Sequence, residues 1–284
     1  MATSPIFKLP FEIRDQIFSL SLGVPTSVRH RIFCDVAPDN RPLLFCLCRH
    51  DSHPWYGGTD CLYTAILRTC QAISEECLDL LYSRLVFTFA ALGNQDDMWT
   101  DLLWFLNEIG EKNRGRLREI SMEAPYVKPV AGSSCPNMPR LAGPWSFGMM
   151  GWRGWVAWGN TLGWEVNPRA ATGALQLSKL TPGLRKFELT ASVQLCYMLK
   201  EEDGSGSASE AQLEVLRKIA KAFSGTGVKV VLDLQGLCYQ GLKPVFDRIA
   251  TEFGWELNAN GLASFGAGSS QSQLLESELA ASPN

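Results

Sequence analysis

The chain has 284 residues, of which 46% are hydrophobic and 19% charged, a composition typical of a globular protein with a sizeable core. Its formal net charge is −3 and its isoelectric point is near 5.7, which argues against a general nucleic-acid-binding protein. No run approaches the ~18 apolar residues of a membrane span, and residues 1–8 lack the pattern of a secretory signal. We therefore expect an intracellular protein, cytoplasmic or nuclear, whose nine cysteines are reduced thiols.

The first predicted element is a short amphipathic helix over residues 9–22. Pro10 suits the first turn, where a backbone N–H has no helical partner, and Gly23 suits the position just past the end. One apolar stripe recurs along this helix at helical spacing: Ile13, Ile17 and Leu20.

Residues 24–62 carry no periodicity and are rich in Pro, Cys, His, Arg and Gly, which predicts an insertion or a long loop. A stronger helix is predicted over 63–82, followed by a strand over 85–89 that is rich in branched and aromatic residues. The helix has one apolar face, formed by Ile66, Cys70, Ile73, Cys77 and Leu80. We expect Cys70 and Cys77 to pack in the core of the protein.

Beyond residue 90, predicted helices and strands alternate. The helices cover 97–111, 171–180, 209–223 and 242–253, and the strands cover 117–122, 184–189 and 228–234. Ser209 and Gln212 form a capping-box pattern at the start of the third of these helices. Alternation of this kind favours a parallel sheet with right-handed crossovers. We therefore predict an α/β fold, with α+β as the alternative, in which N-terminal helices pack on an irregular helix–strand layer that resembles leucine-rich repeats.

The predicted organisation has three parts. Residues 5–90 form a helical region that contains the insertion 24–62. Residues 91–265 form the helix–strand region, which contains a second insertion, rich in Trp and Gly, over 124–170. Residues 266–284 are predicted to be a disordered tail.

The first insertion holds the residues that come nearest to a metal site. Thiolates and imidazoles are the ligands that zinc prefers. Because their spacing contains no Cys-x2-Cys pair, we predict no metal or cofactor and keep a structural zinc as an alternative. The residues concerned are Cys46, Cys48, His50, His53 and Cys61.

The second insertion concentrates tryptophans, with five of the nine in the chain lying between Trp145 and Trp164. Rigid aromatic side chains are frequent contact residues of binding surfaces. We predict that Trp152, Trp155 and Trp158 contact a partner. The alternative is a loop that buries its indoles over the sheet.

No catalytic constellation is recognisable in the sequence. No histidine follows His53, which removes a histidine base from the helix–strand region, and no phosphate-binding glycine motif is present. An enzyme on this fold would need a cleft at the carboxyl ends of the strands, near Glu123, Glu188 or Asp233. Those residues are equally explained as polar groups at strand ends, so we predict a protein without enzymatic activity.

Two N-terminal segments carry more specific motifs. One runs Leu-Pro-Phe-Glu-Ile-Arg-Asp-Gln-Ile from Leu9, and the other runs Leu-Arg-Thr-Cys-Gln-Ala-Ile-Ser-Glu-Glu from Leu67 and ends in Leu-Leu-Tyr at Tyr82. Together they resemble the F-box-like proteins of filamentous ascomycete fungi. The resemblance implies a first helix whose apolar face binds the adaptor subunit of a cullin ubiquitin ligase. It assigns docking to Leu9, Pro10, Ile13 and Ile17.

We therefore expect a non-enzymatic protein-interaction module, an F-box-like substrate adaptor of a cullin ubiquitin ligase, with no nucleic-acid or membrane partner. Two alternatives stay open. One is a scaffold or interaction protein that keeps the fold without a ubiquitin-ligase role, and the other is a binding domain stapled by a structural zinc.

Overall fold

The computed structural model describes residues 5–22, 31–36, 42–46, 64–89, 95–125, 128–129, 164–165, 168–191, 195, 199, 206–234 and 243–259. A seven-stranded sheet in the order β2-β1-β3-β4-β7-β8-β9 forms its centre. Every pairing from β1 to β9 in this order is parallel, and β2 is antiparallel to β1 at one edge. The predicted parallel α/β sheet is therefore confirmed.

The strands of this sheet are β1 (Arg31–Val36), β2 (Pro42–Cys46), β3 (Val86–Phe89), β4 (Glu119–Glu123), β7 (Lys186–Thr190), β8 (Lys229–Asp233) and β9 (Glu256–Asn258). A separate two-stranded ladder joins β5 (Lys128–Pro129) to β6 (Trp164–Glu165). Two 3-10 helices, η1 (Pro5–Lys8) and η3 (Thr64–Arg68), precede the first two long helices. The α-helices are α1 (Phe11–Leu22), α2 (Gln71–Arg84), α3 (Gln95–Arg114), α5 (Pro168–Leu180), α7 (Gly206–Phe223) and α8 (Lys243–Phe253).

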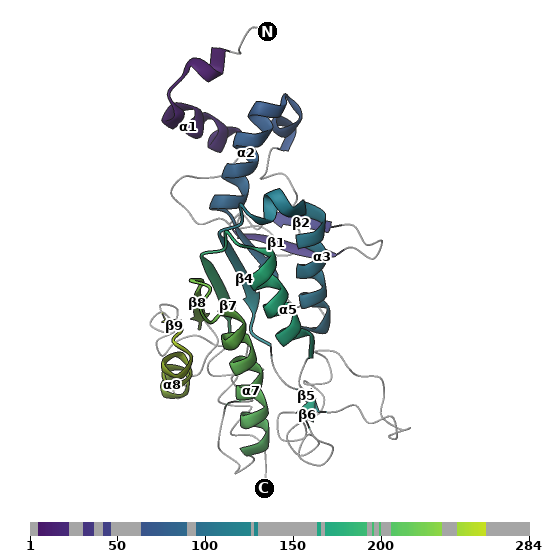
Figure 1. Cartoon of the computed structure of the whole chain (residues 1–284), viewed down its shortest axis with the longest axis vertical. Coiled ribbons are helices and arrows are strands. Elements are labelled where there is room, and N and C mark those ends of the chain that lie inside the picture. The colour runs from purple at the N-terminus through teal and green to yellow at the C-terminus, as the bar shows by residue number, and fades with distance from the viewer. Residues whose placement is uncertain are drawn as a thin grey trace, which may run out of the picture.

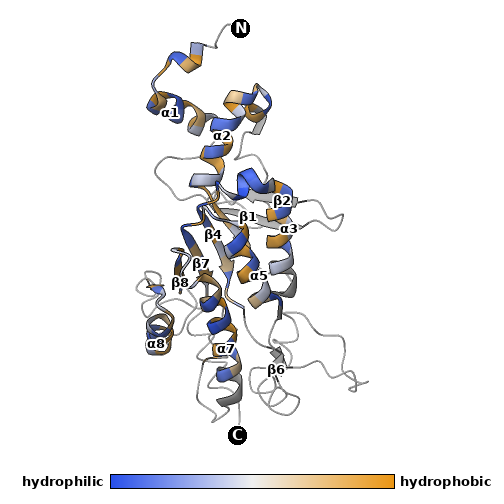
Figure 2. Ribbon diagram, in the orientation of Figure 1, coloured by the Kyte–Doolittle hydropathy of each residue, from blue (hydrophilic) through white to orange (hydrophobic). Residues whose placement is uncertain are grey.

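Helices α3, α5 and α7 lie side by side across one face of the sheet, whereas α1 lies at one end of the molecule, beyond α2 (Figure 1). Each helix of the layer buries one stripe, and the orange and blue bands along α7 show this alternation (Figure 2). In α7 the stripe is Val215, Leu216, Ile219 and Phe223, which recur at helical spacing and are buried. Burying one face of each helix against the sheet accounts for the layered arrangement.

Aromatic contacts identify the face of the sheet that the helices cover. Phe105 of α3 lies 5.2 Å from Phe87 and 5.5 Å from Phe89 between ring centroids. Phe187 of β7 lies 4.9 Å from Phe223 of α7 by the same measure. Because side chains alternate along a strand, the residues between these aromatics point to the opposite face.

Several sequence predictions differ from the structure in detail. Two strands, β1 and β2, lie inside the segment 24–62 that was expected to be an insertion or long loop. The helix predicted over 63–82 is interrupted at Thr69 and Cys70, so that η3 and α2 are separate elements. The short edge strand β9 was not predicted. Strands from both predicted regions, 5–90 and 91–265, belong to the same sheet.

The capping-box prediction at Ser209 was wrong. Helix α7 begins three residues earlier, at Gly206, so Gln212 lies in its second turn. The Gln212 side chain is buried and its Nε2 donates to the carbonyl oxygen of Pro125 at 2.8 Å. A tertiary hydrogen bond therefore takes the side chain that local spacing had assigned to the helix end.

Candidate functional site

Helix α1 is apolar on two opposite faces. Its inner face packs on α2 and buries Phe18 and Leu22, which are 1% and 0% exposed. Its outer face, defined here as Ile13, Ile17 and Leu20, contains the stripe predicted from the sequence. Ile13 is 42% and Leu20 79% exposed, whereas Ile17 is half-buried against the core. A helix needs only one apolar face to pack on its own protein, and exposed apolar side chains on a second face are a common feature of binding surfaces.

The predicted docking residues Leu9 and Pro10 lie directly before α1, and both are exposed. Leu9 donates its N–H to Ile6, and the Pro10 carbonyl accepts the N–H groups of Ile13 and Arg14 at 3.1 Å. Pro10 therefore occupies the position just before the first helical residue, where proline's missing N–H is harmless. The structure brings Leu9, Pro10, Ile13 and Ile17 together on one end of the molecule.

Ion pairs hold the inner face of α1 on α2. Arg84 Nη2 donates to both carboxylate oxygens of Asp15, at 2.7 and 2.6 Å, and Arg84 Nη1 donates to Ser19 Oγ at 2.9 Å. Arg14 Nε donates to Glu76 Oε2 at 3.0 Å. The Arg84 guanidinium thus contacts two residues of α1 through its two terminal nitrogens, and charged hydrogen bonds of this kind are stronger than neutral ones. These contacts orient α1 so that Phe18 and Leu22 face α2 and the outer face points away from it.

A second set of charges fixes α2 on the body of the protein. Glu75 pairs with Lys112 at 2.6 Å and with Arg116. Hydrogen bonds from Lys112 and then Arg116 lower the pKa of Glu75 below its ordinary value. The N-terminal helices are thereby connected to α3 through α2.

Cys70 and Cys77, the two cysteines of the motif that begins at Leu67, lie in different environments. Cys77 is buried, and its burial raises the pKa of the thiol to about 11, with a smaller contribution from Glu76. Cys70 is exposed, directly before α2, so the expectation that it packs in the core was wrong. The interruption between η3 and α2 is the reason, because helical spacing no longer relates residue 70 to residue 77.

The sheet face opposite the helices is polar and buried. Thr88, Ser121 and Glu188 are side by side in register on β3, β4 and β7, and all three are buried. Ser121 Oγ donates to Glu188 Oε1 at 3.1 Å, and Lys186 Nζ pairs with Glu188 Oε2 at 2.9 Å. Among the residues that the structure describes, Thr88 Oγ1 finds no hydrogen-bond partner. Buried polar groups of this kind stabilise a fold only when they are satisfied.

The acids considered for an enzyme lie on this same face. Asp233 is buried on β8 and accepts a hydrogen bond from Asn258 Nδ2 at 3.0 Å. Glu123, Thr190, Asp233 and Asn258 form one row at the carboxyl ends of their strands. Strand β2 pairs with the outer side of β1, whereas β3, β4, β7, β8 and β9 follow in chain order on its other side.

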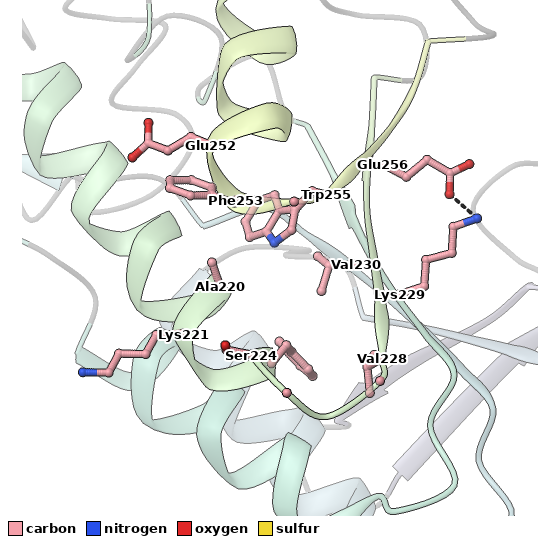
Figure 3. Close-up of a pocket in the computed structure, with 14 residues that line it drawn as sticks. Ala220, Lys221, Ser224, Val228, Lys229, Val230, Glu252, Phe253, Trp255 and Glu256 are labelled. Carbon is pink, nitrogen blue, oxygen red and sulfur yellow. Dashed lines mark ion pairs between the residues drawn. The ribbon is translucent and has the colours of Figure 1, made fainter.

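A groove of about 810 Å³ lies at the other strand ends, between the turn from α7 to β8 and the turn from α8 to β9. Figure 3 shows Trp255 in the middle of this groove, with Phe253 beside it and the Lys229–Glu256 ion pair at one side. Gly254, at φ 66°, ends α8 in a turn that lets the Trp255 N–H reach the Ala250 carbonyl at 2.8 Å. The groove therefore lies where two helices, α7 and α8, end beside each other.

The remaining predicted site residues lie outside what the structure describes. Trp152, Trp155 and Trp158 fall there, as do Cys48, His50, His53 and Cys61. Cys46 is the last residue of β2, and its side chain is not described. Among the described residues, no group of three or more His, Cys, Asp or Glu side chains is arranged to hold a metal ion.

Comparisons with known proteins give no relative. No family model, no curated protein and no solved structure matches this chain. None of the helices in the described part of the chain is long and apolar enough to cross a membrane.

Proposed function

We propose that this chain is a non-enzymatic protein-interaction module that binds a partner protein through the outer face of α1. The observation that carries the proposal is the exposure of apolar side chains on a helix already packed by its opposite face. Leu20 is 79% exposed and Ile13 42%, and Leu9 and Pro10, directly before α1, are exposed as well. Burying a fully exposed leucine or isoleucine contributes about 1.5–3 kcal/mol, so Leu20 would contribute most of that amount and the partly buried Ile13 less.

The specific partner we propose is the F-box-receiving adaptor of a cullin ubiquitin ligase. The Leu-Pro-x-Glu-Ile-Arg motif from Leu9 and the Thr-Cys-x-x-Ile motif from Thr69 support it, because each begins just before one of two helices, α1 and α2, that pack together. The body would then present the substrate-binding surface. Strands β3, β4, β7, β8 and β9 follow one another in chain order, and α3, α5 and α7 lie side by side across one face of the sheet, which supports the resemblance to a leucine-rich-repeat layer.

The alternative is an interaction protein that uses the same surface without a ubiquitin ligase. Both functions need the outer face of α1, so they differ in the partner and not in the residues. The adaptor itself is therefore the probe that separates them.

The test is a titration of the purified full-length protein with the purified adaptor by calorimetry. The informative variant is Ile13→Asp/Leu20→Asp, because both side chains are exposed and neither is needed for the core. Ile17 is avoided because it packs partly on the core. Leu175→Asp is the matched control, since Leu175 is a 45% exposed leucine on α5.

We expect the wild-type chain and Leu175→Asp to bind the adaptor with equal affinity, and the double variant to lose binding at micromolar concentrations while keeping its circular dichroism spectrum. Binding by a folded Ile13→Asp/Leu20→Asp variant would remove the outer face from the function. No binding by the wild-type chain would leave the interaction-protein alternative.

A further inference from the structure

Arg14 of α1 contacts several neighbouring segments of the chain with a single side chain. Its Nε donates to Glu76 of α2 at 3.0 Å, and its Nη1 donates to the carbonyl oxygen of Leu9 at 2.9 Å. The guanidinium carbon also lies 5.8 Å from the ring centroid of Phe7 and 5.9 Å from that of Phe11. One side chain therefore connects η1, the Leu9–Pro10 pair, α1 and α2.

The Leu9–Pro10 pair has few other restraints. Leu9 and Pro10 lie between η1 and α1 and belong to neither, and both side chains are exposed, so packing does not fix them. The Leu9 N–H reaches back to Ile6, inside the same short segment. The hydrogen bond from Arg14 is the described contact that ties the Leu9 backbone to a side chain held by α2.

We propose that Arg14 is a positioning residue for partner binding, which rests on the docking function proposed above. It holds Leu9 and Pro10 in line with Ile13 and Leu20 before the partner arrives. A surface that is already ordered loses less conformational entropy on binding, and this raises affinity without adding a contact.

Arginine is suited to this position for a geometric reason. Its planar fork donates in two directions at once, here to Glu76 and to Leu9, while its flat face lies against aromatic rings. Lysine carries a single ammonium group on a flexible stem and cannot reproduce this arrangement. The side chain of Arg14 is only 17% exposed, so solvent weakens these contacts less than it would on an open surface.

The experiment uses the full-length chain and two readouts. Affinity for the adaptor is measured by calorimetry, and backbone order in residues 6–13 is measured by hydrogen exchange with mass spectrometry in the absence of the adaptor. The variants are Arg14→Met, Arg14→Lys and Glu76→Gln. Arg84→Met is the matched control, because Arg84 pairs α2 with Asp15 and Ser19 of α1 without contacting Leu9.

We expect Arg14→Met to speed exchange at the amides of Leu9 and Ile13 and to weaken adaptor binding by about tenfold, as the loss of charged hydrogen bonds would. Arg14→Lys should rescue only part of both effects. Glu76→Gln, which leaves the bond to Leu9 in place, should weaken binding less. Arg84→Met should lower the melting temperature without speeding exchange in residues 6–10.

Each outcome separates this inference from the function on which it rests. Unchanged exchange in Arg14→Met would overturn the positioning role whether or not the adaptor binds. Faster exchange with unchanged affinity would also overturn it, because order at Leu9 would then not matter for binding. Absence of binding by the wild-type chain would instead overturn the adaptor function.

Discussion

Phe18 and Leu20 are two residues apart on α1 and lie in opposite environments, with Phe18 1% and Leu20 79% exposed. A separation of two residues turns an α-helix by about 200°, so the two side chains point to opposite sides of the helix. Phe18 meets α2, and Leu20 meets solvent. The helix is thus held by one apolar face and presents another.

This relationship predicts unequal effects of truncation. Phe18→Ala should lower the free energy of unfolding by about 3–5 kcal/mol, because it removes a buried aromatic ring and leaves a cavity. Leu20→Ala should change it by less than about 0.5 kcal/mol, as expected at an exposed position. Urea denaturation followed by tryptophan fluorescence gives both values. Equal losses in the two variants would mean that the inner and outer faces are assigned wrongly.

Gly173 gives a second prediction, because it leaves room for a tryptophan. A Cβ atom added at Gly173 on α5 would lie 2.5 Å from Cε3 of Trp99 on α3, and Trp99 is completely buried. Gly173→Ala should therefore lower the free energy of unfolding by about 1–3 kcal/mol through overpacking, although alanine favours helices over glycine.

The control for this prediction is a double-mutant cycle with Trp99→Phe. The smaller ring withdraws the atoms that the new methyl group would meet, so Gly173→Ala should cost less in the Trp99→Phe background. If the two losses in free energy of unfolding simply add, then contact between α3 and α5 is not what disfavours a larger side chain at residue 173.

The third prediction concerns the ion pair between partly exposed Lys186 and buried Glu188. Glu188→Leu should lower the free energy of unfolding by about 1–3 kcal/mol, because Lys186 loses its carboxylate and Ser121 loses its acceptor. Lys186→Met/Glu188→Leu should recover part of that loss, since no unpaired charge remains. Thermal and urea unfolding of the wild-type chain, Lys186→Met, Glu188→Leu and the double variant measure the coupling. A double variant as unstable as the sum of the single changes would contradict this account.

Cys70 and Cys77 provide a fourth prediction, on reactivity. Near neutral pH, iodoacetamide should alkylate exposed Cys70 in the folded protein and leave buried Cys77 unmodified. Both residues lie in one tryptic peptide, from Thr69 to Arg84, so fragment spectra can assign the label. Labelling in denaturant is the control and should modify both. Alkylation of Cys77 at the rate of Cys70 would show that α2 does not bury it.

The same thiol affects stability at high pH. The pKa of Cys77 is about 11 in the folded protein against an ordinary value of 9.0, so folding favours the protonated thiol. The stability that the buried, protonated Cys77 thiol contributes is fully present below pH 9.0 and is lost as the pH rises towards about 11. Replacing Cys77 by alanine should flatten this part of the stability profile.

Local periodicity predicted much of the fold. The helices at α3, α5, α7 and α8 and the strands at β3, β4, β7 and β8 were placed within a few residues of their ends. Their apolar residues recur at the spacing of one helical face or form a short run bounded by polar residues. These are properties of neighbouring residues, so a single chain suffices to predict them.

Other features depend on residues distant in sequence and could not be predicted. Strand β1 pairs with β3 across a separation of more than fifty residues, and nothing in Arg31–Val36 alone indicates that partner. Gln212 matched a local capping pattern but binds Pro125, 87 residues away. Arg14 pairs with Glu76, which lies 62 residues along the chain.

For α1, the sequence by itself determined that Ile13, Ile17 and Leu20 share a face, because helical spacing dictates which side chains align. It did not determine which face meets the core, since Phe18 and Leu22 form a second apolar stripe on the same helix. Only the tertiary structure decided this, through the ion pairs of Arg84 with Asp15 and of Arg14 with Glu76. Those contacts join residues more than sixty positions apart, and they leave Ile13 and Leu20 of the predicted stripe exposed while Phe18 and Leu22 are buried.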